Sequence, residues 1–271
     1  MRQVNAIAEV TSHGQAAAAL ESGASEIYLN LEYSSLEELR RCQSLFQEAA
    51  GRLTAIIPRV ISDKALEELL ASLEGEDVKS VSVGNVGALG AARKRFKVSA
   101  EHWMNVYNTH ALRFLKENGV DRAVPSLELN MKELRVLAKA SKKIGIEIAC
   151  LVHGEIELMT TRQCLVYNAL GRGACGGCEK TSFYIRDEKG FKFPVRRDER
   201  CLNHIFNSRE LRMEGYIDFL LKNGVSNLRF NLSFKDESHI RIVLAAYLRR
   251  VSLTRDDRTG FTRAHYFRGV A

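Results

Sequence analysis

The sequence predicts an α/β fold, and within that class a (β/α)8 barrel of the TIM type. Two observations favour it: short apolar runs alternate with longer amphipathic segments, and eight such runs occur in a chain of 271 residues, the size and rhythm of such a barrel. A doubly wound open sheet is the alternative. It is disfavoured because no Gly-rich dinucleotide fingerprint follows the first apolar run.

Eight segments have the apolar, strand-like composition of a buried parallel sheet. They cover residues 5–10, 25–30, 53–60, 78–84, 97–106, 121–128, 146–153 and 226–232. Helical spacing of apolar residues marks residues 13–22, 35–50, 63–73, 109–118, 130–144 and 207–223. Gly119 and Gly224 follow two of these helices, where a left-handed C-cap turns the chain into the next strand.

One connection breaks this rhythm, because about fifty residues separate the seventh strand from the last predicted helix. We therefore expect the first seven strands in residues 1–153, a Cys-rich metal-binding insertion in 154–206, and the last βα unit with a C-terminal tail in 207–271, all in a single domain. Loops that follow barrel strands lie on the face that carries active sites, so the insertion is expected over the mouth. Residues 182–195 are predicted to form a hairpin with its turn at 187–190.

Four cysteines lie in this connection: Cys164, Cys175, Cys178 and Cys201, with ten, two and twenty-two residues between successive members. Glycines around the close pair allow a sharp turn that brings two thiolates to one centre. Four thiolates bind Zn2+ or hold a [4Fe-4S] cluster, and one close pair joined by two solitary cysteines favours the cluster. Cys42 and Cys150 lie in an amphipathic helix and an apolar strand, so we expect them in the core.

The chain shows neither a secretory signal pattern nor a long apolar span, so the expected location is cytoplasmic and no membrane span is expected. In that reducing compartment clustered cysteines favour a metal site over disulfides. Residues 180–271 carry 19 Lys and Arg against 11 Asp and Glu, whereas residues 1–179 carry 21 against 22. This cationic part would attract RNA or a small carboxylate, although a merely solvated basic surface explains it as well.

Polar side chains stand where the predicted strands end, and in a barrel these ends converge on one mouth. The predicted substrate-binding residues there are Arg59, Asn85, Asn105 and Asn108, and the predicted catalytic pair is Glu128 and His153. A carboxylate and an imidazole exchange protons, and arginine clamps an anion. His265 and Arg268 stand among aromatic residues in the tail and are predicted to bind an anion or a base. Helix capping is the alternative role for each strand-end residue.

The order of these motifs resembles the collagenase-like peptidase family U32. The resemblance rests on Pro58-Arg59, on residues 84–89 and 105–108, on His153-Gly154, on the cysteine order, and on Thr262-x-x-His265-Tyr266-Phe267-Arg268-Gly269-Val270. It spans nearly the whole chain. Three departures stand out: Glu155-Ile156-Glu157 where many relatives have Ala-Leu-Cys, Ala264 where glycine is usual, and two residues inside the close cysteine pair where three are frequent.

The resemblance implies a barrel core and a [4Fe-4S] cluster on Cys164, Cys175, Cys178 and Cys201. It also implies oxygen-independent hydroxylation of transfer RNA, ribosomal RNA or another aromatic ring, with a small carboxylate such as prephenate as oxygen donor. We therefore expect an iron-sulfur-dependent RNA-modification enzyme. One alternative is a collagenase-like peptidase, although the chain has neither a His-Glu-x-x-His nor a Gly-x-Ser-x-Gly motif. Another is a non-catalytic RNA-binding or partner subunit of a heteromer.

Overall fold

The computed structural model describes residues 4–46, 52–171, 182–225, 227–250, 253 and 260–268. By its internal contacts the chain divides into two compact units. The first comprises residues 1–153, 213–254 and 263–271, and the second comprises residues 154–212 and 255–262.

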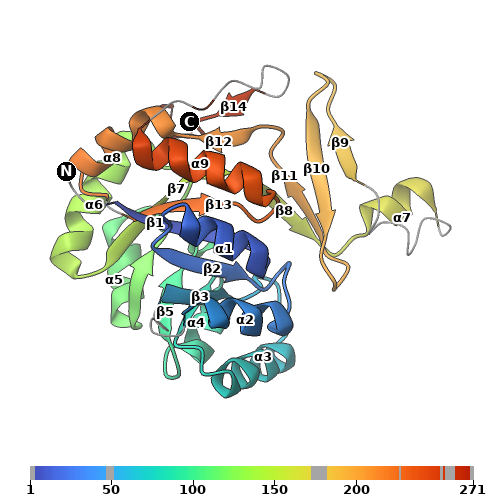
Figure 1. Cartoon of the computed structure of the whole chain (residues 1–271), viewed down its shortest axis with the longest axis horizontal. Helices are drawn as coiled ribbons and strands as arrows, with labels where there is room; N and C mark the ends of the chain where they lie inside the picture. The colour runs from blue at the N-terminus through green and yellow to red at the C-terminus, as the bar shows by residue number, and fades with distance from the viewer. Residues whose placement is uncertain are drawn as a thin grey trace. The chain divides into compact units, whose positions relative to one another are not determined.

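The first unit is a closed barrel of eight strands with helices between them (Figure 1). The strands are β1 (Asn5–Val10), β2 (Glu26–Asn30), β3 (Leu53–Ile56), β4 (Ser80–Val83), β5 (Lys97–Ala100), β6 (Val120–Ala123), β7 (Glu147–Gly154) and β13 (Asn227–Asn231). Neighbours from β1 to β7 pair in parallel in chain order. β13 pairs with both β1 and β7, which closes the cylinder and confirms the predicted (β/α)8 fold.

Short polar side chains start most of the helices that surround these strands. The helices are α1 (His13–Glu21), α2 (Leu36–Gln43), α3 (Asp63–Gly75), α4 (Val86–Ala92), α5 (Thr109–Glu117), α6 (Met131–Ile144), α8 (Ile217–Lys222) and α9 (Glu237–Arg249), with 3-10 turns η1 (Ser44–Phe46), η3 (His102–Met104) and η5 (Glu214–Tyr216). Seven of them have a Ser, Asn or Asp N-cap whose side chain accepts a first-turn N–H. Asn130 and Glu133 form a complete capping box at α6.

The inside of the barrel is filled by side chains, as its size requires. One buried cluster is drawn from β1, β2, β3 and β7 and from the residue that follows β6: Ile7, Tyr28, Ile56, Ala149 and Val124. The strand sequences are nearly continuous apolar runs, because one face of each strand packs inside the barrel and the other packs against the helices.

Sequence patterns missed some elements of the fold. The helix expected over residues 207–223 is wrong in its first half, which instead holds β12 (Glu210–Arg212) and η5 before α8 begins. Leu211 is buried between two half-buried residues, which is the alternation of a strand and not of a helix. Helices α4 and α9 were not predicted. The glycines of α4 weaken its helical signal.

The second unit contains a four-stranded antiparallel sheet of order β8-β11-β10-β9. Its strands are β8 (Glu157–Thr161), β9 (Phe183–Arg186), β10 (Lys192–Arg197) and β11 (Asn203–Phe206). The unit also has helix α7 (Leu165–Leu170) and the short parallel pair β12 and β14 (Phe261–Thr262). β9 and β10 confirm the predicted hairpin, whose turn is fixed by the Phe191 N–H bonding to Asp187 Oδ1 at 2.8 Å.

The helices in the described part of the chain are all too short or too polar to cross a bilayer. The longest, α6, has 14 residues.

Candidate functional site

Arg59, predicted to bind substrate, lies just after β3 at the carboxyl end of the barrel. Its guanidinium stacks on the ring of Trp103, with 4.7 Å between Cζ and the ring centroid. Gly84 makes room for this pair, since a Cβ there would lie 3.0 Å from Trp103 Cε3 and 3.5 Å from Arg59 Cγ. The stack holds the long arginine side chain in one position beside the strand ends.

The three predicted asparagines have local backbone roles. Asn85 caps α4 by accepting from the Ala88 N–H at 2.7 Å, and its amide donates to the Arg59 carbonyl at 2.9 Å. Asn108 caps α5 by accepting from two first-turn N–H groups. Asn105 adopts the left-handed conformation, with φ 53°, at the end of η3. These contacts explain why asparagine recurs after the strands without invoking a substrate.

Glu128, predicted as a proton-handling group, is exposed in the loop between β6 and α6. It accepts a short hydrogen bond from the Tyr107 hydroxyl. This bond raises the pKa of Tyr107, because ionising the phenol would remove the donor and place two negative charges together. The pair is accessible to a ligand at the carboxyl end of the barrel.

His153, predicted as the partner of Glu128, is fully buried at the end of β7. Its Nδ1 lies 3.4 Å from the Tyr247 hydroxyl, which itself donates to the Val152 carbonyl at 2.7 Å. The two rings meet edge to face with centroids 5.5 Å apart. His153 is thus held in the core, in an environment different from that of exposed Glu128.

The tail that carries His265 and Arg268 is docked on the barrel by Tyr266. The Tyr266 ring is buried, its hydroxyl donates to the Leu151 carbonyl at 2.7 Å, and its carbonyl accepts from Met131 N at 2.8 Å at the start of α6. Burial raises the pKa of Tyr266 well above its ordinary value, so the hydroxyl remains a donor. His265 and Arg268 on either side are exposed.

A buried charged cluster inside the barrel escaped the sequence prediction. Arg229 of β13 is 1% exposed, and its Nη2 lies 3.0 Å from Glu9 Oε2 and 3.2 Å from Glu101 Oε1. Asn30 donates to Glu9 at 2.8 Å, and Ser82 donates to Glu101 at 2.6 Å. The partners of Arg229 come from the carboxyl halves of their strands or, for Glu101, from just beyond β5, and Arg229 itself is the central residue of β13. Barrel enzymes place catalytic groups at the carboxyl ends of the strands.

The Arg229 guanidinium is only partly satisfied by the protein. Among the described residues, its buried Nε and Nη1 atoms have no hydrogen-bond acceptor. The plane of the group lies over the Tyr28 ring, with Cζ 4.0 Å from the centroid. Buried donors without an acceptor are costly, so this group is suited to receive an oxygen or nitrogen from a ligand. The signal in the sequence was a charged residue in the middle of an apolar strand.

Cys164 and Cys201 belong to the second unit, where strand register shows to which end of the sheet each of them is directed. Phe183, Val195, Ile205 and Met159 lie in one row across the four-stranded sheet. Followed forwards along the chain from this row, β8 runs to Cys164. Followed backwards along the chain, β11 runs to Cys201 and β9 runs to residue 182. All three chain directions point to the same end of the sheet. Cys164 and Cys201 therefore share one end of the sheet with the entry to β9.

The Cys201 turn is built around Asp198, whose side chain is fully buried. Asp198 Oδ1 accepts from the Arg200 N–H at 3.0 Å and the Leu202 N–H at 2.8 Å, and the Asp198 carbonyl accepts from Cys201 N at 3.1 Å. The turn holds Cys201 at φ 59° and leaves it exposed. Arg197 Nη1 donates to Cys201 Sγ at 3.1 Å. The Arg197 guanidinium therefore faces the Cys201 sulfur directly.

Cys164 has a comparable environment, because it caps α7 and its Sγ accepts from the Tyr167 N–H at 3.4 Å. Cys175 and Cys178 lie outside the described residues. Cys42 and Cys150 are buried as predicted, and burial raises the pKa of both thiols to about 12. These two remain protonated at neutral pH and are poor metal ligands.

Comparison with known proteins identifies the family. The profile described as peptidase family U32 matches residues 11–265. The chain belongs to peptidase family U32. A solved U32 peptidase, Mk0906, superposes with a TM-score of 0.53 at 11% identity over 86% of this chain and 94% of that chain, which shows a shared fold.

Three curated relatives of this U32 chain are named for work on RNA. The 23S rRNA 5-hydroxycytidine C2501 synthase of Escherichia coli is 19% identical over 85% of this chain and 35% of its own length. The tRNA hydroxylation protein P1 of Bacillus subtilis is 21% identical over 67% of this chain and 44% of its own. The tRNA hydroxylation protein P of Helicobacter pylori is 26% identical over 61% of this chain and 42% of its own length. The chain spans less than half the length of each relative.

Proposed function

We propose that this U32 protein takes part in oxygen-independent hydroxylation of a base in transfer or ribosomal RNA, with a [4Fe-4S] cluster held by Cys164, Cys175, Cys178 and Cys201. The observation that carries the proposal is the strand register of the four-stranded sheet, which directs Cys164, Cys201 and the start of β9 to the same end of that sheet. The names of the curated relatives support the reaction class.

The donor set suits such a cluster. Cys164 Sγ accepts a backbone N–H, and Cys201 Sγ accepts from the Arg197 guanidinium. Hydrogen bonds of this kind orient thiolate ligands and offset their charge. Zn2+ is the alternative occupant, since four thiolates bind it equally well. When bound, the cluster would supply either electron transfer or an iron atom with an open position.

The barrel residues would bind and orient the substrate. Arg229 offers N–H donors to the oxygen or ring nitrogen of a base, and Glu9 and Glu101 beside it accept from an amino or imino group. His265 and Arg268 are exposed on the docked tail and would contact phosphate or a small carboxylate oxygen donor such as prephenate. The excess of basic residues over residues 180–271 would attract the RNA backbone.

The cluster is tested on protein purified without oxygen. We expect a brown protein with broad visible absorbance and matching amounts of iron and acid-labile sulfide. Cys164→Ser and Cys201→Ser are expected to lose both, whereas Cys42→Ala and Cys150→Ala are expected to keep them, because those thiols are buried and protonated. A colourless protein that retains zinc would overturn the iron-sulfur assignment.

The substrate class is tested by mass spectrometry of nucleosides from transfer and ribosomal RNA. A deletion strain is expected to lack one hydroxylated nucleoside, and wild-type protein is expected to restore it while Cys201→Ser does not. An RNA profile that the deletion leaves unchanged would rule out RNA hydroxylation and return attention to peptidase activity. Restoration by Cys201→Ser would instead identify a non-catalytic partner subunit.

A further inference from the structure

We propose that the amino end of the barrel holds a second binding site, which takes a small hydroxylated monocarboxylate. A cavity of about 410 Å³ opens there, within the range of small-molecule sites. Its lining comes from the first residues of several strands, including Glu26 of β2, Ser80 of β4, Lys97 of β5 and Glu147 of β7. The cavity is therefore separate from the carboxyl-end residues to which the proposed reaction is assigned.

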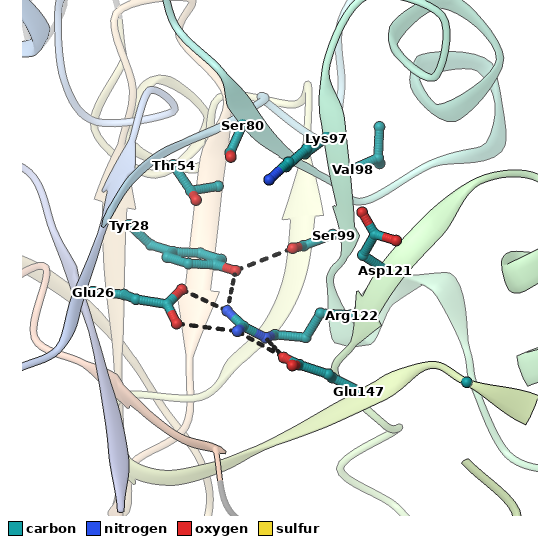
Figure 2. Close-up of a pocket in the computed structure, with 11 residues that line it drawn as sticks. Glu26, Tyr28, Thr54, Ser80, Lys97, Val98, Ser99, Asp121, Arg122 and Glu147 are labelled. Atoms are coloured by element: carbon teal, nitrogen blue, oxygen red, sulfur yellow. Dashed lines mark hydrogen bonds and ion pairs between the residues drawn. The ribbon is translucent and has the colours of Figure 1, made fainter. Parts of the chain in front are cut away.

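One wall of the cavity presents an unused cation and two hydroxyls. Ser80 pairs directly with Lys97 in the sheet, and Thr54 lies beside Ser80 on the adjacent strand. Figure 2 shows the Lys97 ammonium and the hydroxyls of Thr54 and Ser80 directed into the same space. Within the described part of the chain these three side chains make neither a hydrogen bond nor an ion pair. An ammonium and two hydroxyls are a suitable donor set for a carboxylate.

The opposite wall is a closed ion-pair network. Arg122 binds Glu26 through two nitrogens at 2.6 and 3.0 Å, and its Nε donates to Glu147 at 2.8 Å (Figure 2). Its Nη1 also donates to the Tyr28 hydroxyl at 3.1 Å. Arg122 is thereby committed to the protein, so Lys97 is the cation in this described lining that remains for a ligand.

The charged side chains on the two walls favour a ligand with a single negative charge. Lys97 and Arg122 are balanced by Glu26 and Glu147, and Asp121 at the rim lies 3.7 Å from Lys116. A single carboxylate pairs with Lys97, but a dianion would bring a second negative charge towards Glu26 and Glu147. Glu147, whose side chain is 58% exposed, retains acceptor capacity for ligand hydroxyl groups. These features together favour a hydroxylated monocarboxylate over a phosphate ester.

Calorimetric titration of the whole chain tests the site, with gluconate and glycerate as probes and inorganic phosphate, succinate and glycerol as comparisons. We expect gluconate or glycerate to bind and the three comparison compounds to bind at least tenfold more weakly. Lys97→Met is expected to weaken the probe at least tenfold, and Ser80→Ala to weaken it by a smaller factor. Lys132→Met, which removes an exposed lysine of α6, is expected to bind as wild type does.

Lys97 is exposed, so its variant should unfold at the wild-type temperature, which circular dichroism verifies. The proposal is overturned if neither probe binds wild-type protein, if Lys97→Met binds as tightly as wild type, or if phosphate binds more tightly than gluconate. None of these outcomes depends on the cluster or on RNA.

Discussion

Arg229 and Glu101 meet across the inside of the barrel, with 3.2 Å between Nη2 of one and Oε1 of the other. Glu9 completes the contact from β1, so one buried guanidinium faces two buried carboxylates. Assembling such a cluster costs free energy, because charged groups must be removed from water. Removing one member costs more, because the partners left behind remain charged and buried.

Replacing Arg229 should therefore destabilise the fold strongly. We expect Arg229→Met to lower the free energy of unfolding by about 3–5 kcal/mol, measured by urea denaturation. Adding Glu9→Gln and Glu101→Gln should recover part of that loss, since no uncompensated charge remains. Arg241→Met breaks an exposed pair with Glu21 and should cost at most about 1 kcal/mol. Equal losses for Arg229→Met and Arg241→Met would contradict this account.

Asp198 should control metal retention through the Cys201 turn. Asp198→Ala removes the acceptor of two backbone N–H groups. We expect affinity for the proposed metal centre to fall by about tenfold or more, the usual effect of losing a residue that orients a ligand. Metal retained during competition with a chelator measures the change. Asp187→Ala, in the hairpin turn at the other end of the same sheet, serves as the matched control and should retain wild-type affinity.

Asn108 is expected to act on stability and not on the reaction. Asn108→Ala removes the α5 cap and should cost about 1 kcal/mol of unfolding free energy. Asn108→Ser should restore most of it, because serine also caps helices. The hydroxylated nucleoside should persist in cells carrying either variant. Its disappearance with both variants, at wild-type protein levels, would return Asn108 to the substrate-binding residues.

Glu26 gives the barrel a component of acid sensitivity. Burial alone would raise the pKa of Glu26, but hydrogen bonds and the charge of Arg122 outweigh it and hold the pKa below 4.5. A lowered folded-state pKa means that the stabilisation is complete above about pH 4.5 and is lost as pH falls through the folded value. Unfolding free energies of wild type and Glu26→Gln should differ most near neutral pH and converge as the pH falls through the lowered folded-state pKa of Glu26. A difference in unfolding free energy between the two proteins that grows as the pH falls would contradict this assignment to Glu26.

Ala264 is expected to be strained. Its φ is 46°, in the left-handed region that favours glycine. We expect Ala264→Gly to stabilise the protein by up to about 1 kcal/mol, seen as a higher melting temperature. Ala140→Gly in α6 should do the reverse by a similar amount, because glycine is unfavourable within a helix. A lower melting temperature for Ala264→Gly would show that the turn tolerates alanine without strain.

The barrel was predictable from sequence because its strands are short apolar runs and most of the segments between them have helical spacing of apolar residues, with Gly119 and Gly224 marking two of the turns into a strand. Clustering of cysteines was equally visible. The Arg229 cluster was not, since which carboxylates approach an arginine depends on ring closure between β13 and β1. Likewise, asparagines after strands look the same whether they cap a helix or bind a substrate, and only the hydrogen bonds of Asn85 and Asn108 distinguish the two.

β1 pairs with β13 through residues 222 positions apart, such as Asn5 and Asn227. During synthesis on the ribosome, one edge of β1 therefore stays unpaired until almost the entire barrel sequence has emerged. An unpaired strand edge is a template for aggregation. Nascent chains that stop before β13 should accordingly depend on chaperones, and a stop codon near residue 226 should yield insoluble protein although seven of the eight barrel strands have been made.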